Sequence, residues 1–299
     1  MNLVEEIRKL RDERDAFIVA HNYQRPEVQD IADFVGDSLE LARIANEIEA
    51  RYLVFCGVHF MAETAAILNP AKTILLPDPL SGCPMADMLT GPQLAEFKAQ
   101  HPGAKVVCYV NSTAEVKALS DCCCTSGNAA KIVARYADDE VLFVPDQHLG
   151  SYVAETLGRE LILWPGYCPT HVRIHPEEIA ALKAAHPGAL VLAHPECPKA
   201  ARDASDHILS TGQMVNFVKD SPAREFIIAT EEGLIHRLQK DNLDKRFHRV
   251  SSYAICPNMK RNTLEKVLTS LRDLSPVVTV AEEVANQARR AIEQMLAWS

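Results

Sequence analysis

The sequence predicts an α/β protein built from three repeated three-layer α/β/α domains, whose parallel sheets are arranged around a pseudo-threefold axis. Short apolar runs alternate with helical segments along all 299 residues, a pattern typical of parallel sheets covered by helices on both faces. An apolar run that stops at Cys-Pro occurs three times, at Cys83, Cys168 and Cys256. The turn His-Pro-Gly-Ala precedes a strand twice, from His101 and from His186. These recurrences indicate one unit of about 86 residues used three times.

The expected elements follow the same order in each unit. An amphipathic helix at 2–13 leads into a buried strand at 16–20, and the same helix-to-strand order returns from 93 and from 178. Second strands that end in small hydroxyl residues are expected at 34–38, 124–128 and 208–212, and third strands at 52–57, 141–145 and 226–230. A fourth strand then runs into each Cys-Pro.

The repeat also predicts the domain boundaries. We expect the first α/β repeat at residues 1–99, the second at 100–184 and the third at 185–272. Two helices, at 262–271 and 281–297, follow the third Cys-Pro and have no fourth unit to introduce. We therefore expect the C-terminal helical segment, 273–299, to pack on the first repeat and close the arrangement.

Composition argues against several classes of partner. The net charge of −9 disfavours a nucleic-acid partner or an anionic membrane surface, since both attract a basic face. The first residues lack the apolar core of a signal peptide, and no apolar run approaches the roughly 18 residues of a membrane-spanning helix. We expect a cytoplasmic protein that acts on small molecules. Nine cysteines, an odd number, are not expected to form a disulfide framework there.

Polar side chains stand at the strand ends of every unit. Aligning the copies places one column at His21, Tyr109 and His194, and a second at Tyr23, Asn111 and Glu196. A third set of hydroxyl residues precedes helices, at Ser38, Ser126 and Thr211. These hydroxyls either cap the helices or help their N-termini to bind an anion. Because ligands lie beyond the carboxyl ends of parallel strands, we expect all nine side chains around one central cavity.

The three Cys-Pro sites predict a metal centre in that cavity. Three thiolates, one from each unit, can hold three irons of a cubane cluster and leave the fourth iron open as a Lewis acid. A structural zinc is the alternative, disfavoured because no fourth Cys or His shares the period. The run Cys122–Cys124 cannot grip one ion jointly, because adjacent strand residues point in opposite directions. His171, three residues after Cys168, is either a neighbour of the cluster or a surface residue.

The motifs taken together resemble the quinolinate synthase (quinolinate synthetase A) family over about residues 17–265. The resemblance rests on the three Cys-Pro sites and on the segments 20–23, 36–38, 109–113, 125–126, 194–197 and 210–212. It implies a three-domain transferase with one [4Fe-4S] cluster on Cys83, Cys168 and Cys256. The family condenses iminosuccinate with dihydroxyacetone phosphate to give quinolinate, releasing phosphate and water, on the way to NAD. In that reaction the open iron would bind the hydroxyl that leaves in the dehydration.

The resemblance also implies roles for individual residues. Those that would bind the iminosuccinate-derived part of the substrate are His21, Ser38, Tyr109, Asn111, Ser126, His194, Glu196 and Thr211. Tyr23 and Glu196 are the first candidates for proton transfer, with His21 and His194 as further options. Tyr167 and Gly127 depart from the family pattern. The implied partners are the two small substrates, with iminosuccinate handed over by L-aspartate oxidase or aspartate dehydrogenase.

Other readings remain open at this point. A reductive dehydroxylase of isoprenoid synthesis or the diphthamide-forming radical enzyme would share three units and three cysteines but would need an electron donor or S-adenosylmethionine. A cluster-bearing sensor would need a partner surface or a DNA-binding segment, and the sequence has neither a basic stripe nor a helix-turn-helix pattern.

Overall fold

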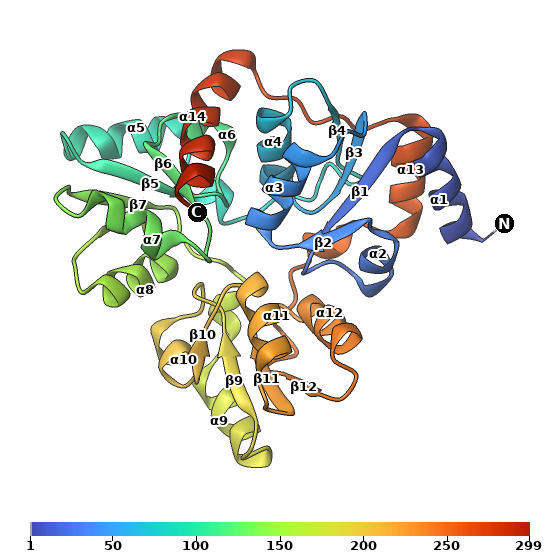
Figure 1. The fold of residues 1–299 in the computed structure, drawn as a ribbon. Coiled ribbons are helices and arrows are strands. Elements are labelled where there is room, and N and C mark those ends of the chain that lie inside the picture. The colour runs from blue at the N-terminus through green and yellow to red at the C-terminus, as the bar shows by residue number, and fades with distance from the viewer. Residues whose placement is uncertain (1) are drawn as a thin grey trace.

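The computed structural model describes residues 2–299, which form one fold pattern three times over (Figure 1). Each repeat holds a four-stranded sheet in which all strands are parallel. The strand order is β2-β1-β3-β4 in the first repeat, and the equivalent strands of the other repeats follow the same order. Helices cover the sheets, so the predicted α/β fold class with three repeated units is confirmed.

The elements of the three repeats correspond closely. The first repeat contains α1 (Leu3–Glu13), β1 (Ala16–His21), α2 (Pro26–Ile31), β2 (Phe34–Gly36), α3 (Ser38–Glu47), β3 (Tyr52–Cys56), α4 (His59–Leu68) and β4 (Thr73–Leu75). The second contains α5 (Gly91–Gln100), β5 (Lys105–Tyr109), α6 (Ala114–Ala118), β6 (Cys122–Cys124), α7 (Ala129–Val133), β7 (Val141–Val144), α8 (Gln147–Leu157) and β8 (Ile162–Leu163). The third contains α9 (Pro176–Ala185), β9 (Leu190–Ala193), α10 (Lys199–Asp203), β10 (His207–Ile208), α11 (Thr211–Asp220), β11 (Glu225–Ala229), α12 (Gly233–Asp241) and β12 (Arg246–Arg249). The chain ends with α13 (Leu264–Asp273) and α14 (Glu282–Trp298).

In the first and third repeats, the helix that follows the second strand has a side-chain N-cap. Asp37 caps α3 and forms a capping box with Glu40, and Ser210 caps α11 in the same way with Gln213. The cap ties down the first free N–H groups of each helix and fixes the direction in which it leaves the strand. The predicted hydroxyl residues therefore stand at the first turn of these helices.

Buried strands supply the core. The central strands β1, β3, β5, β7, β9 and β11 are mostly inaccessible, and one apolar cluster extends from the first repeat into the other two. Shared packing of this kind holds the repeats in fixed positions, which a site built from all three requires. Among residues 2–299, no helix is both long and apolar enough to cross a bilayer.

The fourth strands stop short of the cysteines, so the expectation that they run into each Cys-Pro is wrong: β4 ends at Leu75, β8 at Leu163 and β12 at Arg249. In the third repeat the strand also lies before the apolar run that the pattern favoured. Strand β12 ends at Arg249, and the apolar run from Val250 to Ile255 forms turns instead of a strand that continues to Cys256. The strand is at the edge of its sheet, and its first and last residues are exposed arginines. Edge strands of natural sheets commonly carry such charges, which the apolar pattern cannot detect.

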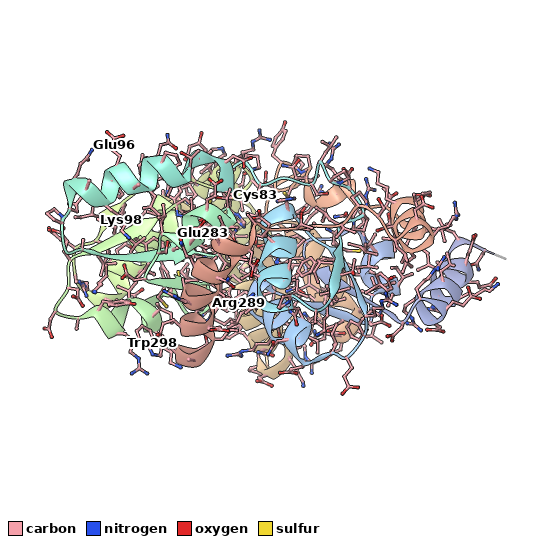
Figure 2. All side chains as sticks on the ribbon, turned by 90° about the horizontal axis from the view of Figure 1, so that it is seen from above. Cys83, Glu96, Lys98, Glu283, Arg289 and Trp298 are labelled. Carbon is pink, nitrogen blue, oxygen red and sulfur yellow. The ribbon has the colours of Figure 1, made fainter. Side chains whose placement is uncertain are left out.

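Helix α14 packs on more than the first repeat, which corrects the expected placement of 273–299. Segment 276–278 does join the first sheet, because Val278 N–H donates to the Ile74 carbonyl (2.9 Å). Figure 2 shows α14, marked by Arg289 and Trp298, running between the first and second repeats. Arg289 Nε donates to the Ile67 carbonyl at the end of α4 (2.8 Å), whereas the Trp298 ring packs edge-on against Tyr136 of the second repeat. The apolar stripe of α14 thus covers the seam between two repeats.

Candidate active site

One cavity lies where the carboxyl ends of the three sheets meet, and all twelve predicted site residues line it. They are His21, Tyr23, Ser38, Cys83, Tyr109, Asn111, Ser126, Cys168, His194, Glu196, Thr211 and Cys256. Each repeat contributes four of them. The columns aligned in the sequence therefore converge in space, as the parallel topology requires.

The same local structure presents each of the three cysteines. A single 3₁₀ turn begins three residues after each cysteine, at Ala86–Met88, His171–Arg173 and Met259–Arg261. In every copy the backbone N–H of that third residue donates to the cysteine sulfur. These are the three cysteines that are half-buried, whereas Cys56, Cys108, Cys122, Cys123, Cys124 and Cys197 are fully buried away from the cavity.

The donor set fits an iron–sulfur cluster. Burial raises the pKa of Cys83 to about 12, and the nearby Cys256 thiolate adds to that shift. Burial and neighbouring thiols likewise raise the pKa of Cys168. Three thiolates gathered in one cavity therefore repel one another until a cation is shared between them. The N–H donors aimed at the sulfurs favour the thiolate form that iron requires.

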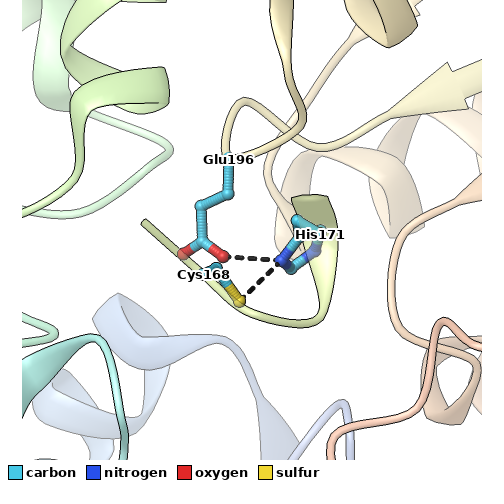
Figure 3. A group of neighbouring side chains, drawn as sticks. All are labelled: Cys168, His171 and Glu196. Atoms are coloured by element: carbon cyan, nitrogen blue, oxygen red, sulfur yellow. Dashed lines mark hydrogen bonds and ion pairs between the residues drawn. The ribbon is translucent and has the colours of Figure 1, made fainter. Parts of the chain in front are cut away.

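His171 connects Cys168 to Glu196, as Figure 3 shows. Its Nδ1 lies 3.1 Å from Cys168 Sγ and 2.7 Å from Glu196 Oε2. The three ligand atoms lie close enough to hold an ion on their own. In that arrangement Cys83 and Cys256 would have no role, so the alternative can be tested by replacing them.

Thr230 extends this network to Tyr23. Its Oγ1 lies 2.8 Å from His171 Nε2 and 2.5 Å from the Tyr23 hydroxyl, and all three side chains are buried. Thr230 is absent from the predicted set because the equivalent positions of the other repeats, at the ends of their third strands, are Gly57 and Pro145. A position whose three copies share no chemistry leaves no signal in a repeat alignment.

Glu231, the next residue, is also absent from the predicted set, although its counterpart in the second repeat, Asp146, is a buried carboxylate too. It is fully buried, its Oε1 accepts the backbone N–H of Cys256 (3.0 Å), and it pairs with Lys260 Nζ at 2.9 Å. Lys260 also donates to the Tyr23 carbonyl (2.7 Å). This pair joins the third cysteine loop to the first repeat.

The other predicted residues are bound together across repeats. The Tyr109 hydroxyl donates to Glu196 Oε1 (2.6 Å), and His194 Nε2 lies 3.2 Å from Ser126 Oγ. Thr211 Oγ1 accepts from Asn22 (3.0 Å). Each of these contacts joins two repeats, so the cavity walls are held in register by the site residues themselves.

The protonation states of the site follow from its burial. Burial lowers the pKa values of His21 and His194 to about 3 against the opposing effect of Glu196, so both imidazoles are neutral at pH 7. Burial, with the Glu196 carboxylate, raises the pKa of Tyr23. Burial alone would raise the pKa of Glu196 too, but His171, His194 and the Tyr109 hydrogen bond together lower it. The site therefore holds an ionised carboxylate beside phenols that keep their protons.

Replacing Thr230 with valine should lower turnover about fivefold, because a lost hydrogen bond worth about 1 kcal/mol leaves the Tyr23 hydroxyl and His171 less well oriented. We expect the loss mainly in kcat, with KM little changed, and we expect Thr230→Ser to restore activity. The measurement is steady-state turnover of both variants at equal iron content. A purely structural role for Thr230 would instead lower the iron content or the thermal stability of the valine variant and leave turnover per cluster unchanged.

The two residues that depart from the family pattern, Tyr167 and Gly127, are not among those that line the cavity. Tyr167 is exposed. Gly127 lies against the third repeat, where an added Cβ would be 3.0 Å from Ser210 Oγ. Glycine at this position allows the second and third repeats to approach closely.

Known proteins resemble this chain over nearly its whole length. The family model described as quinolinate synthetase A protein matches residues 5–297. A quinolinate synthase from Dehalococcoides mccartyi strain CBDB1 is 56% identical over 97% of this chain and 96% of its own length. Quinolinate synthases from Methanoregula boonei (52% identical, 99% and 98% covered) and Geotalea uraniireducens (51% identical, 98% and 96% covered) match to a similar extent. The chain therefore belongs to the quinolinate synthetase A family.

Proposed function

We propose that this protein is a quinolinate synthase, which condenses iminosuccinate with dihydroxyacetone phosphate to quinolinate and releases phosphate and water in the synthesis of NAD. The observation that carries the proposal is the convergence of twelve residues from all three repeats on a single cavity, in a chain that belongs to this family. We further propose that the enzyme works in the cytoplasm and receives iminosuccinate from L-aspartate oxidase or aspartate dehydrogenase.

The dicarboxylate substrate would be held by hydroxyls and helix starts. Ser38 and Thr211 are the first residues of the ten-residue helices α3 and α11. The caps Asp37 and Ser210 already accept N–H groups of these first turns, so the Ser38 and Thr211 hydroxyls would be the donors there, and the helix dipole would favour negative charge. Ser126, Asn111 and Tyr109 add neutral donors from the second repeat. These donors explain how an acidic protein can bind an anion.

Cys83, Cys168 and Cys256 would hold the [4Fe-4S] cluster. When bound, the cluster would supply a Lewis-acidic iron that polarises a substrate hydroxyl or carbonyl. His171, bonded to the Cys168 sulfur, orients that ligand and links it to Glu196.

The proton transfers would be carried by Glu196 and Tyr23. Condensing the two substrates requires phosphate loss, imine formation, proton shifts and dehydration, so the site needs one base and one acid. The ionised Glu196 carboxylate can accept a proton, and the Tyr23 phenol, which retains its proton, can donate one. Neutral His21 and His194 can orient substrate oxygens or relay a proton.

The alternative enzymes make different demands. A reductive dehydroxylase needs an electron donor, and the diphthamide-forming enzyme needs S-adenosylmethionine, whereas the proposed condensation is redox-neutral. The curated relatives that match over nearly the whole chain carry the name quinolinate synthase, which favours the condensation.

The test is quinolinate formation by anaerobically purified protein, given iminosuccinate generated in place and dihydroxyacetone phosphate, with iron and sulfide assayed on the same sample. We expect quinolinate together with about four irons per chain. A full cluster without product would overturn the proposed reaction but keep the three-cysteine site. Absence of iron under strict anaerobiosis would overturn the cluster as well.

A further inference from the structure

We propose that the outer end of the third repeat binds a Zn²⁺ ion through His186, Glu225 and His248. The three residues come from separate elements: His186 ends α9, Glu225 begins β11, and His248 is within β12. They lie at the amino ends of the strands, where α9 finishes at the bottom of Figure 1, whereas the cavity lies at the carboxyl ends. The site is thus separate from the proposed active site.

The ligand atoms are already gathered. His186 Nδ1 lies 3.1 Å and His248 Nε2 lies 2.8 Å from the same atom, Glu225 Oε1. All three ligand atoms fall within 4.8 Å of one another. Ligand atoms around a tetrahedral zinc, bound at 2.0–2.1 Å, stand about 3.3 Å apart. Zinc binding therefore needs only small side-chain adjustments.

The second repeat contains the same histidine–glutamate pair without a third ligand. There His101 occupies the position of His186 and contacts Glu140, the counterpart of Glu225, at 3.3 Å. This histidine-to-carboxylate pair closes the turn between helix and strand in both repeats, so it is explained by the fold alone.

His248 is found in the third repeat only, and the shared fold does not explain it. It pairs in register with Ile227, and the corresponding partner in β8 is Ile162, opposite Leu142. In the third repeat an imidazole has taken this place, and its ring stacks on His186 with the centroids 3.7 Å apart. Two stacked imidazoles cannot both take up a proton without mutual repulsion, whereas after one ring rotates both can offer an in-plane lone pair to one cation.

The chemistry and access suit zinc. Two imidazoles and one carboxylate are a common three-ligand set, in which water completes the coordination. All three side chains are partly exposed, between 23% and 31%, so an ion can enter from solvent. Bound zinc would fasten the end of α9 to β11 and β12, and it would stabilise the third repeat by mass action.

The experiment is anaerobic equilibrium dialysis of the cluster-loaded protein against micromolar ZnCl₂, with zinc per chain measured by mass spectrometry. His248→Ile installs the residue of the second repeat and should lose one equivalent of zinc relative to the parent. His101→Ala, which breaks the other histidine pair, should retain it. Thermal unfolding should shift upward with zinc in the parent and in His101→Ala but not in His248→Ile.

Zinc bound by the cysteines does not affect this comparison, because the parent, His248→Ile and His101→Ala contain the same cysteines. Equal zinc in the parent and His248→Ile, or no zinc in the parent, would overturn the proposal. If His248→Ile does not fold, Glu225→Gln serves in its place: loss of the equivalent supports the site, and retention overturns it. Quinolinate formation should be the same in His101→Ala and His248→Ile, so the outcome is independent of the proposed function.

Discussion

Alanine at Cys83, Cys168 or Cys256 should abolish the proposed iron–sulfur cluster in each single variant. Each thiol is presented by one repeat, and each receives an N–H from its own 3₁₀ turn, so no other described cysteine can replace it. Losing one of three ligands leaves two irons of the cubane without protein ligands, which an oxygen-sensitive cluster does not survive. Iron and sulfide content of anaerobically purified variants is the measurement.

Cys123→Ala is the matched control. Cys123 is fully buried in β6 and is absent from the cavity lining, so this variant should keep full iron content. Equal loss across all four variants would contradict the site, because it would show that any buried cysteine change harms the fold. Retention of metal in Cys83→Ala and Cys256→Ala would instead favour an ion held by Cys168, His171 and Glu196.

Tyr23→Phe should keep the cluster and lose turnover by about 10²-fold or more, the usual contribution of a positioned acid or base. The change removes one buried hydroxyl that bonds Thr230 and lies 3.5 Å from His171 Nε2, and it preserves the ring. Steady-state quinolinate formation per cluster is the measurement, and iron content should equal that of the parent.

Tyr253→Phe provides the control, because Tyr253 is 67% exposed and should tolerate the same change without effect. Unchanged turnover in Tyr23→Phe would reduce Tyr23 to a packing role and leave Glu196 with the histidines as the proton carriers. A lower iron content would show instead that Tyr23 supports the cluster.

The periodic part of the site could be predicted from the sequence because its residues recur in register. Parallel strands end at one edge of their sheet, so a column of polar residues in the alignment places one residue on each of the three walls of the cavity. That reasoning identified Cys83, Cys168 and Cys256 as neighbours across long stretches of chain, and the structure places all three on the same cavity.

Features present in a single copy could not be predicted in this way. Thr230 has counterparts of different chemistry in the other repeats, Gly57 and Pro145, so no comparison within the chain singles it out. The edge strand β12 is charged where the apolar pattern favoured the later run 250–255, because an edge strand has one side free for solvent. An amphipathic pattern also shows that α14 has an apolar face but does not show which repeats that face will cover.

The three cysteines of the cavity come from three different repeats, so translation completes the set of thiols one repeat at a time. Cys83, Cys168 and Cys256 lie in three successive repeats, so they leave the ribosome one after another. A ribosome-bound chain therefore has no complete ligand set until Cys256 has emerged. The proposed cluster would then be loaded only after the third repeat has been made.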